Sequence, residues 1–106
     1  SEWWPMTNAA PATVADCALG NRFTTTATLA INIISFKNCK SGQTALIRVQ
    51  VDATGGRNIL FATGSPRAIT QNTKASTTIN AVNFYGIVFQ GNYATILGYA
   101  SSTPTN

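Results

Sequence analysis

Residues 45–61 constrain the fold of this chain more than any other stretch. Apolar residues recur at every second position from Ala45 to Val51, which is the pattern of a β-strand with one buried face. After them, Gly55 and Gly56 can adopt positive φ without a steric penalty, and Asp52 can accept hydrogen bonds from main-chain amides two or three residues ahead. The stretch predicts a β-hairpin with residues 59–61 as its return strand. The structural turn residues of this hairpin are Asp52, Gly55, Gly56 and Arg57.

Further strands are predicted on both sides of this hairpin. Apolar residues alternate along residues 24–33 and place Ala27, Leu29, Ile31 and Ile33 on one face, and residues 77–89 and 93–99 form two later strands. Of the 106 residues 44% are hydrophobic and only 9% are charged, and the rest favour strands and turns over helices. We therefore expect one all-β domain, a small β-sandwich or jelly-roll-like fold of six to eight strands.

The two ends of the chain lack this alternation. Residues 1–23 are expected to form an extended N-terminal arm, residues 24–100 the β-sandwich domain and residues 101–106 a polar tail. Trp3 and Trp4 in the arm could pack over the edge of the domain, dock into a neighbouring subunit or stack on a sugar. We assign them as an assembly anchor, so a chain that begins near Gly20 should fold and assemble weakly.

The strand at residues 77–89 carries apolar side chains on both of its faces. Such a strand is either sandwiched between sheets or exposes one side to a partner subunit. In a chain of this length the second option leads to a predicted oligomer interface. Its residues are Phe84, Tyr85, Ile87 and Phe89.

The charged residues exclude several classes of function. Seven basic and three acidic residues give a net charge of +4, but the basic residues are scattered, whereas nucleic-acid binders concentrate such charge on one stripe. The charge is compatible with an anionic surface such as bacterial lipopolysaccharide. No stretch approaches the roughly 18 apolar residues of a membrane span, so we expect no membrane insertion.

Enzymatic chemistry is not expected either. The chain has no histidine, which is the commonest general base and metal ligand. Its acidic residues are Glu2, Asp16 and Asp52, and neither a metal site nor the carboxylate pair of a glycosidase can be recognised among them. We predict a protein without a cofactor, a metal or catalytic residues.

A resemblance to a known family rests on the run Val-Asp-Ala-Thr-Gly-Gly-Arg at residues 51–57. This run is preceded by Gly-Gln at 42–43 and followed by Ala-Val-Asn at 81–83 and an aromatic-Gly-Asn turn. Over about residues 24–99 the chain resembles a small β-domain of tailed-bacteriophage tail fibres and related virion appendages. It departs from that family at Phe61-Ala62, where the family has Trp-Pro, and at residues 90–93, where the family has an Asp-Gly hairpin.

The resemblance implies a structural module of a virion, assembled in the host cytoplasm. We expect a homotrimeric tail-fibre, spike or head-fibre domain that contacts other virion proteins and contributes to host adsorption. A bacterial surface glycan or lipopolysaccharide is the expected receptor. Alternatives are a capsid decoration protein that clamps capsid subunits, and a carbohydrate-binding module. The candidate receptor contacts are Arg67, Gln71, Asn72, Lys74, Tyr93 and Tyr99.

Cys17 and Cys39 form one possible disulfide. Closing a loop of this size would stabilise the fold by roughly 3 kcal/mol in the chain-entropy model. Phage structural proteins, however, assemble in a reducing cytosol, where disulfides are rare. We therefore favour two buried free thiols and keep the disulfide as the alternative.

Overall fold

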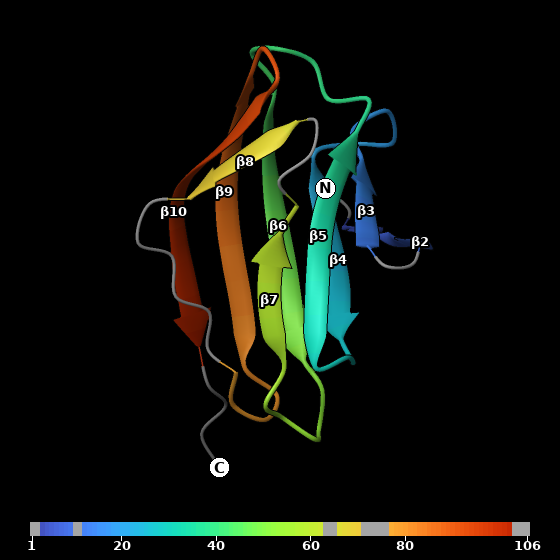
Figure 1. Ribbon diagram of the computed structural model, residues 1–106, viewed down its shortest axis with the longest axis vertical. Coiled ribbons are helices and arrows are strands. Elements are labelled where there is room, and N and C mark those ends of the chain that lie inside the picture. The colour runs from blue at the N-terminus through green and yellow to red at the C-terminus, as the bar shows by residue number, and fades with distance from the viewer. Residues whose placement is uncertain (1–2, 10–11, 63–65, 71–76, 103–106) are drawn as a thin grey trace.

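The computed structural model describes residues 3–9, 12–62, 66–70 and 77–102, and they form ten strands in two sheets (Figure 1). The six-stranded sheet A has the order β1 (Trp4–Pro5), β4 (Arg22–Ala27), β6 (Thr44–Val51), β9 (Val82–Gln90), β10 (Tyr93–Ser102) and β8 (Arg67–Thr70). The four-stranded sheet B has the order β2 (Thr7–Ala9), β3 (Ala12–Asp16), β5 (Ile31–Lys37) and β7 (Asn58–Phe61). The expected all-β sandwich is confirmed, but its ten described strands exceed the six to eight expected, because the short strands of the N-terminal segment were not predicted.

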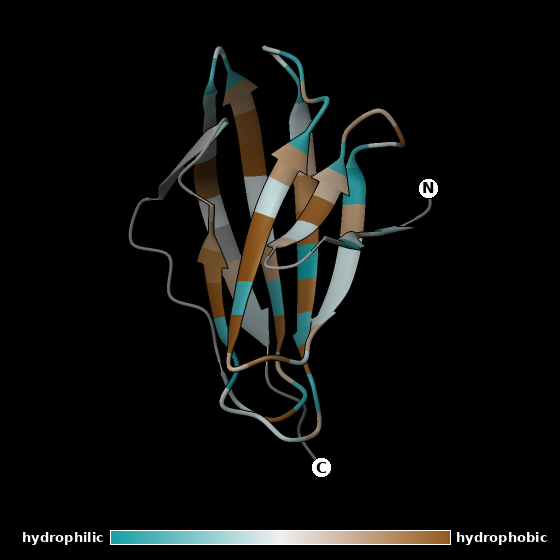
Figure 2. Ribbon diagram, turned by 45° about the vertical axis from the view of Figure 1, so that its right-hand side comes forward, coloured by the Kyte–Doolittle hydropathy of each residue, from teal (hydrophilic) through white to brown (hydrophobic). Residues whose placement is uncertain are grey.

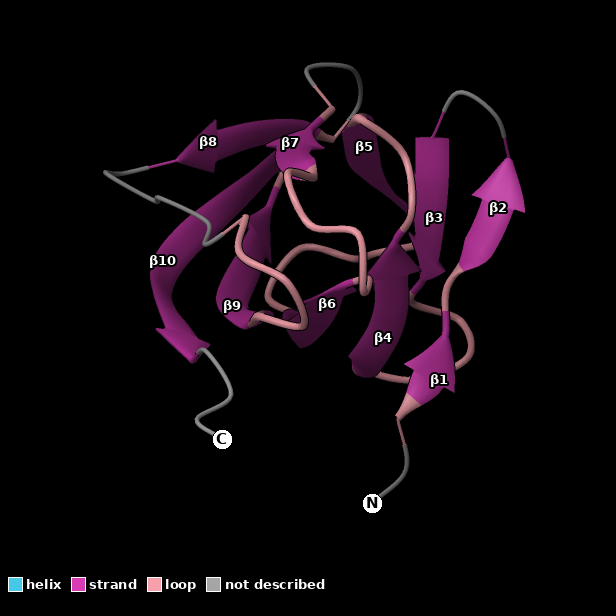
Figure 3. Ribbon diagram, turned by 90° about the horizontal axis from the view of Figure 1, so that it is seen from below, coloured by secondary structure: helices cyan, strands magenta, loops and turns pink. Residues whose placement is uncertain are grey.

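The chain alternates between the two sheets from β3 to β7. Strands β4 and β6 lie in sheet A, and β3, β5 and β7 lie in sheet B. Among these five strands, neighbours in the same sheet are separated by one strand of the other sheet in sequence and run parallel, as Arg22 beside Leu46 and Ile31 beside Asn58 show. Seen along the strands, β4, β6, β9 and β10 form one layer and β3, β5 and β7 the other (Figure 3).

The predicted hairpin at residues 45–61 is wrong. Strand β6 pairs with β4 and β9, whereas β7 pairs with β5 in the other sheet. The segment 52–57 reverses the chain but carries it across the roughly 10 Å between packed sheets. The alternation of β6 is the same in a hairpin and in such an arch, because both bury one face of the strand.

The core between the sheets contains three of the four residues predicted at an oligomer interface. Tyr85, Ile87 and Phe89 are at most 2% exposed, and the ring of Tyr85 packs edge-on against Phe61 of sheet B. Only Phe84 points to the outer face. The interface prediction is wrong for these three because sheet B covers one face of β9, so successive residues of this strand lie alternately in the core and on the outer face. Strands of both sheets carry hydrophobic positions (Figure 2).

The predicted strand at residues 24–33 is divided into two. Strand β4 ends at Ala27 and β5 begins at Ile31 in the other sheet. The side chain of Asn32 accepts a hydrogen bond from the amide of Leu29 and donates to the Leu29 carbonyl, which closes the turn. As a result Leu29 and Ile31, expected on the buried face, are 59% and 54% exposed.

The N-terminal residues are not an arm that stands apart from the domain. Strands β2 and β3 belong to sheet B, and Ala15 of β3 is fully buried in the core. Apolar alternation is weak there because the strands are short and rich in alanine and threonine. A chain beginning near Gly20 would lack β3, which argues against the expectation that such a chain folds.

A disulfide joins Cys17 and Cys39, with their Cα atoms 4.9 Å apart. The expectation of two free thiols is therefore wrong. The two residues follow β3 and β5, which are parallel neighbours whose ends come together, and the Cys17 amide donates to the Lys37 carbonyl. The bond ties these two strands at one end of sheet B.

Candidate functional site

The local geometry of the turn around Asp52 matches the prediction, although the turn connects strands of two different sheets and not the strands of a hairpin. Gly55 and Gly56 have φ of 77° and 67°, and Asp52 accepts hydrogen bonds from the amides of Thr54 and Gly55 at 3.2 Å. Arg57 also donates from Nε and Nη2 to the Asp52 carboxylate. These hydrogen bonds, that from Arg57 above all, lower the pKa of Asp52, and the carboxylate raises the pKa of Arg57.

The tip of this turn packs against the segment before β9. The Gly56 amide donates to the Thr77 carbonyl at 2.8 Å, and the Asn80 amide donates to the Asp52 carbonyl at 3.2 Å. The turn thus ties the β6–β7 connection to residues 77–81. Its residues are engaged within the chain, which favours a structural role over contact with a receptor.

Trp3 and Trp4 lie on their own domain. The Trp3 ring is 6.2 Å from that of Phe84 between centroids, and the guanidinium carbon of Arg22 lies 4.7 Å above the Trp3 ring centroid. Trp4, in β1, packs against Gly20 so closely that a Cβ there would overlap its indole. Of the three roles considered for these tryptophans, the structure shows the first, packing at the edge of their own domain.

The candidate receptor contacts are only partly brought together. The backbone of Tyr93 at the start of β10 is in register with that of Arg67 in β8, and Tyr93 is 48% exposed. Tyr99 lies farther along β10, in register with Tyr85 of β9. The side chains of Arg67 and Tyr99 lie outside the described part of the structure, as do residues Gln71, Asn72 and Lys74 entirely.

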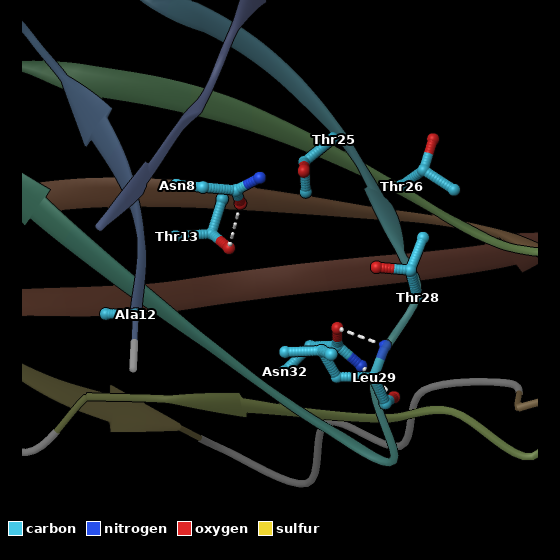
Figure 4. Close-up of a pocket in the computed structure, with 8 residues that line it drawn as sticks. All are labelled: Asn8, Ala12, Thr13, Thr25, Thr26, Thr28, Leu29 and Asn32. Atoms are coloured by element: carbon cyan, nitrogen blue, oxygen red, sulfur yellow. Dashed lines mark hydrogen bonds between the residues drawn. The ribbon is translucent and has the colours of Figure 1, made fainter. Parts of the chain in front are cut away.

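A pocket of about 400 Å³ opens at the edge of the sandwich where β4 meets β2 and β3 (Figure 4). It lies where the N-terminal chain leaves sheet A after β1 and enters sheet B as β2. We call it the β4 pocket. Its lining residues are Asn8, Ala12, Thr13, Thr25, Thr26, Thr28, Leu29 and Asn32.

Side chains of both sheets face one another across the β4 pocket. Thr25 and Thr28 point toward Asn8 and Thr13, whereas Thr26 lies on the opposite side of β4 (Figure 4). The Thr13 hydroxyl donates to Oδ1 of Asn8 at 3.2 Å. Sequence reasoning missed this site, because Thr26, Thr28 and Asn32 fall on the polar face of the single strand expected at residues 24–33.

The backbone of β4 is open at this pocket. The Met6 amide donates to the Thr24 carbonyl at 3.0 Å, so the main-chain groups of Thr24 point toward β1. Main-chain groups of alternate strand residues point to the same edge, which places the N–H and C=O of Thr26 on that side as well. Strand β1 ends at Pro5, in register with Thr24, and no other described strand pairs with this edge.

A second feature is an apolar patch on the outer face of sheet B. Ile31 and Leu60 are 54% and 51% exposed, and Ile33 is in register with Leu60 on the neighbouring strand. Val14 of β3 is in register with Ser35, one position farther along this face. We call Val14, Ile31, Ile33 and Leu60 the sheet-B face.

The described part of the chain has neither a cluster of metal ligands nor a long apolar helix. It contains no group of three or more His, Cys, Asp or Glu residues placed to hold a metal ion. Its residues also form no helix long and apolar enough to cross a membrane. Comparisons with protein-family models, curated proteins and solved structures found no match for this chain.

Proposed function

We propose that this protein is a non-enzymatic structural module of a bacteriophage virion appendage that self-associates as a homotrimer and contributes to adsorption to the host surface. The sheet-B face is the observation that carries the proposal. Ile31 and Leu60 expose about half of their surface on adjacent strands, and contiguous apolar patches on a sheet mark surfaces that bind another protein. The trimer and the virion are what the resemblance around residues 51–57 implies.

The distribution of charge favours another copy of the chain as the partner at this face. The whole chain carries +4, yet the only charged residues on the outer face of sheet B among those described are Asp16 and Lys37, which are in register and 3.9 Å apart. Copies can therefore approach through this face without bringing unbalanced positive charge together. Arg22 and Arg48 lie on the other sheet.

The test is the mass of the protein in solution at tens of micromolar by light scattering. We expect three copies for the natural chain and a shift toward one copy when Ile31→Thr and Leu60→Thr are combined, because threonine keeps strand propensity and removes apolar area. Leu97→Thr is the matched control, since Leu97 is 70% exposed but lies in β10 of sheet A. A monomer at every concentration, or an equal effect of the control, would overturn the proposal.

A carbohydrate-binding module is the second candidate, favoured by the disulfide. Disulfides are typical of proteins that work outside the reducing cytosol. A virion protein leaves the reducing cytosol only when the particle is released, whereas a secreted module can form its disulfide during export. Labelled antibody against the protein should decorate phage particles under the first proposal, and should leave them bare under the second.

A further inference from the structure

We infer that the β4 pocket binds a neutral saccharide unit, an inference that rests on the proposed role in surface attachment. Its eight lining residues supply hydroxyl, amide and apolar groups and include no charged side chain. A charged ligand would have to leave water there without an opposite charge, which is costly. A sugar hydroxyl can donate and accept, and so matches threonine hydroxyls and asparagine amides.

The hydroxyls of the pocket are available to a ligand. Within the described residues, Thr25, Thr26 and Thr28 make no side-chain hydrogen bond to other residues, whereas Thr24 beside them accepts one from Arg48 at 3.2 Å. Thr25 and Thr28 point into the space toward Asn8 (Figure 4). These two hydroxyls are therefore the side-chain groups placed to contact a ligand.

The open edge of β4 supplies main-chain groups in the same place. The N–H and C=O of Thr26 point toward the side on which β1 ends at Thr24. Unpaired main-chain N–H and C=O groups at a sheet edge form hydrogen bonds with an incoming acceptor or donor. A ligand hydroxyl at this position would continue the pairing that Met6 makes with the Thr24 carbonyl.

The pocket is held in shape before a ligand arrives. Asn32, 7% exposed, donates to the carbonyls of Leu29 and Asn58 at 2.7 and 3.0 Å and accepts from the Leu29 amide. These bonds fix the turn that carries Thr28 and Leu29. A site that is already ordered loses less conformational entropy on binding.

The remaining features fit a sugar ring. Leu29, 59% exposed at the rim, offers an apolar surface for the C–H groups of a ring, and polar groups on the other sides fix its orientation. The volume of about 400 Å³ lies within the roughly 300–1,000 Å³ of small-molecule sites. Asn32 is a positioning residue here, because its side-chain amide is engaged by the main chain.

A glycan array of neutral and anionic glycans, followed by calorimetry on the best neutral glycan, tests the inference on the full chain. We expect neutral glycans to bind, and Thr25→Val and Thr28→Val each to weaken binding about tenfold, since valine keeps the shape and removes the hydroxyl. Thr44→Val is the matched control, an exposed threonine at the start of β6 outside the pocket, and should bind as the natural chain does.

Three results would overturn the inference: no neutral glycan bound, binding of anionic glycans alone, or full binding by both pocket variants. Circular dichroism of each variant separates loss of binding from loss of fold, and Thr28 follows β4 at an exposed position, so we expect valine there to leave the core undisturbed. If no saccharide binds, the light-scattering test of the trimer still stands on its own. A monomeric protein that still binds saccharide would overturn the proposed trimeric module and leave the assignment of the β4 pocket standing.

Discussion

Gly55 and Gly56 have the same left-handed backbone but different surroundings. A Cβ on Gly55 would lie 2.8 Å from Cγ1 of Ile79 and 3.2 Å from its amide nitrogen, whereas a Cβ on Gly56 would meet nothing within 4 Å. A left-handed non-glycine residue costs about 1–2 kcal/mol. We therefore expect Gly56→Ala to lower the free energy of unfolding by about 1 kcal/mol.

Gly55→Ala should cost more than Gly56→Ala, roughly 2 kcal/mol or more, because Ile79 must also move. Urea unfolding of the two variants beside the natural chain measures the difference, with Gly56→Ala as the matched control. Equal losses would contradict the packing of the turn against residues 77–81.

Acid should destabilise the protein through Asp52. Hydrogen bonds, first that from Arg57, lower its folded pKa below the ordinary value of 3.8, so the folded state binds fewer protons than the unfolded state around that pH. The stability contributed by Asp52 is then fully present above about pH 5 and is lost as the pH falls through the folded pKa. We expect Asp52→Asn to be less stable than the natural chain at neutral pH.

The same substitution should make stability less dependent on pH below about 4, because the asparagine side chain does not titrate. Asp16 retains part of the dependence, since its pKa is also lowered, chiefly by a hydrogen bond from Asn38. Thermal unfolding between about pH 2 and pH 7 checks both statements. An acid slope in Asp52→Asn as steep as in the natural chain would refute this role of Asp52.

Local chemistry was the most predictable level of this structure. The roles of Asp52 as hydrogen-bond acceptor and of Gly55 and Gly56 at positive φ follow from residue type and spacing alone, and both are confirmed. The partner of the turn could not be predicted in the same way. Contact between Gly55 and Ile79 depends on how distant strands are arranged.

At the scale of elements, strands were predictable but their pairing was not. The alternation in β6 predicted a strand with Ala45, Ile47, Val49 and Val51 buried, and all four are buried. The same alternation cannot say whether the next strand lies beside it or in the facing sheet. Short strands such as β2 and β3 escaped prediction because few of their residues are strongly apolar.

Two truncations distinguish the contributions of the N-terminal strands. Removal of residues 1–5 deletes β1, which pairs with β4 at two positions only, and should leave the fold intact. Removal of residues 1–19 deletes β3, the buried Ala15 and Cys17, and should prevent stable folding. Circular dichroism and thermal unfolding measure both. A folded, cooperative protein after the longer truncation would contradict the place of β3 in the core.

Reduction of the Cys17–Cys39 bond should weaken the tie between β3 and β5. The bond spans 22 positions of sequence, and a loop of this size contributes about 3 kcal/mol in the chain-entropy model. We expect Cys17→Ala with Cys39→Ala to fold with a lower melting temperature, and reducing agent to have no further effect on that variant. Equal melting temperatures with and without reductant in the natural chain would contradict the bond.

At the scale of the whole molecule, fold class was predictable and the site was not. Composition and alternation were enough to predict a small all-β sandwich. The β4 pocket, however, combines Asn8 of β2, Thr13 of β3 and Thr25 of β4 with the turn at Leu29. The spacing of residues in the sequence does not predict that these segments meet. They meet because the chain crosses from sheet A to sheet B between β1 and β2.

The central claim is that the open edge of β4 is a binding surface, and amide chemical shifts of ¹⁵N-labelled protein test it most directly. On titration with neutral hexoses to about 100 mM, where millimolar affinities are detected, we predict shifts confined to the lining residues 8, 12, 13, 25, 26, 28, 29 and 32. Thr28→Val should reduce them, and Thr44→Val should not. Shifts absent from these residues, or gathered around Trp3 and Phe84 on the outer face of sheet A, would contradict the claim.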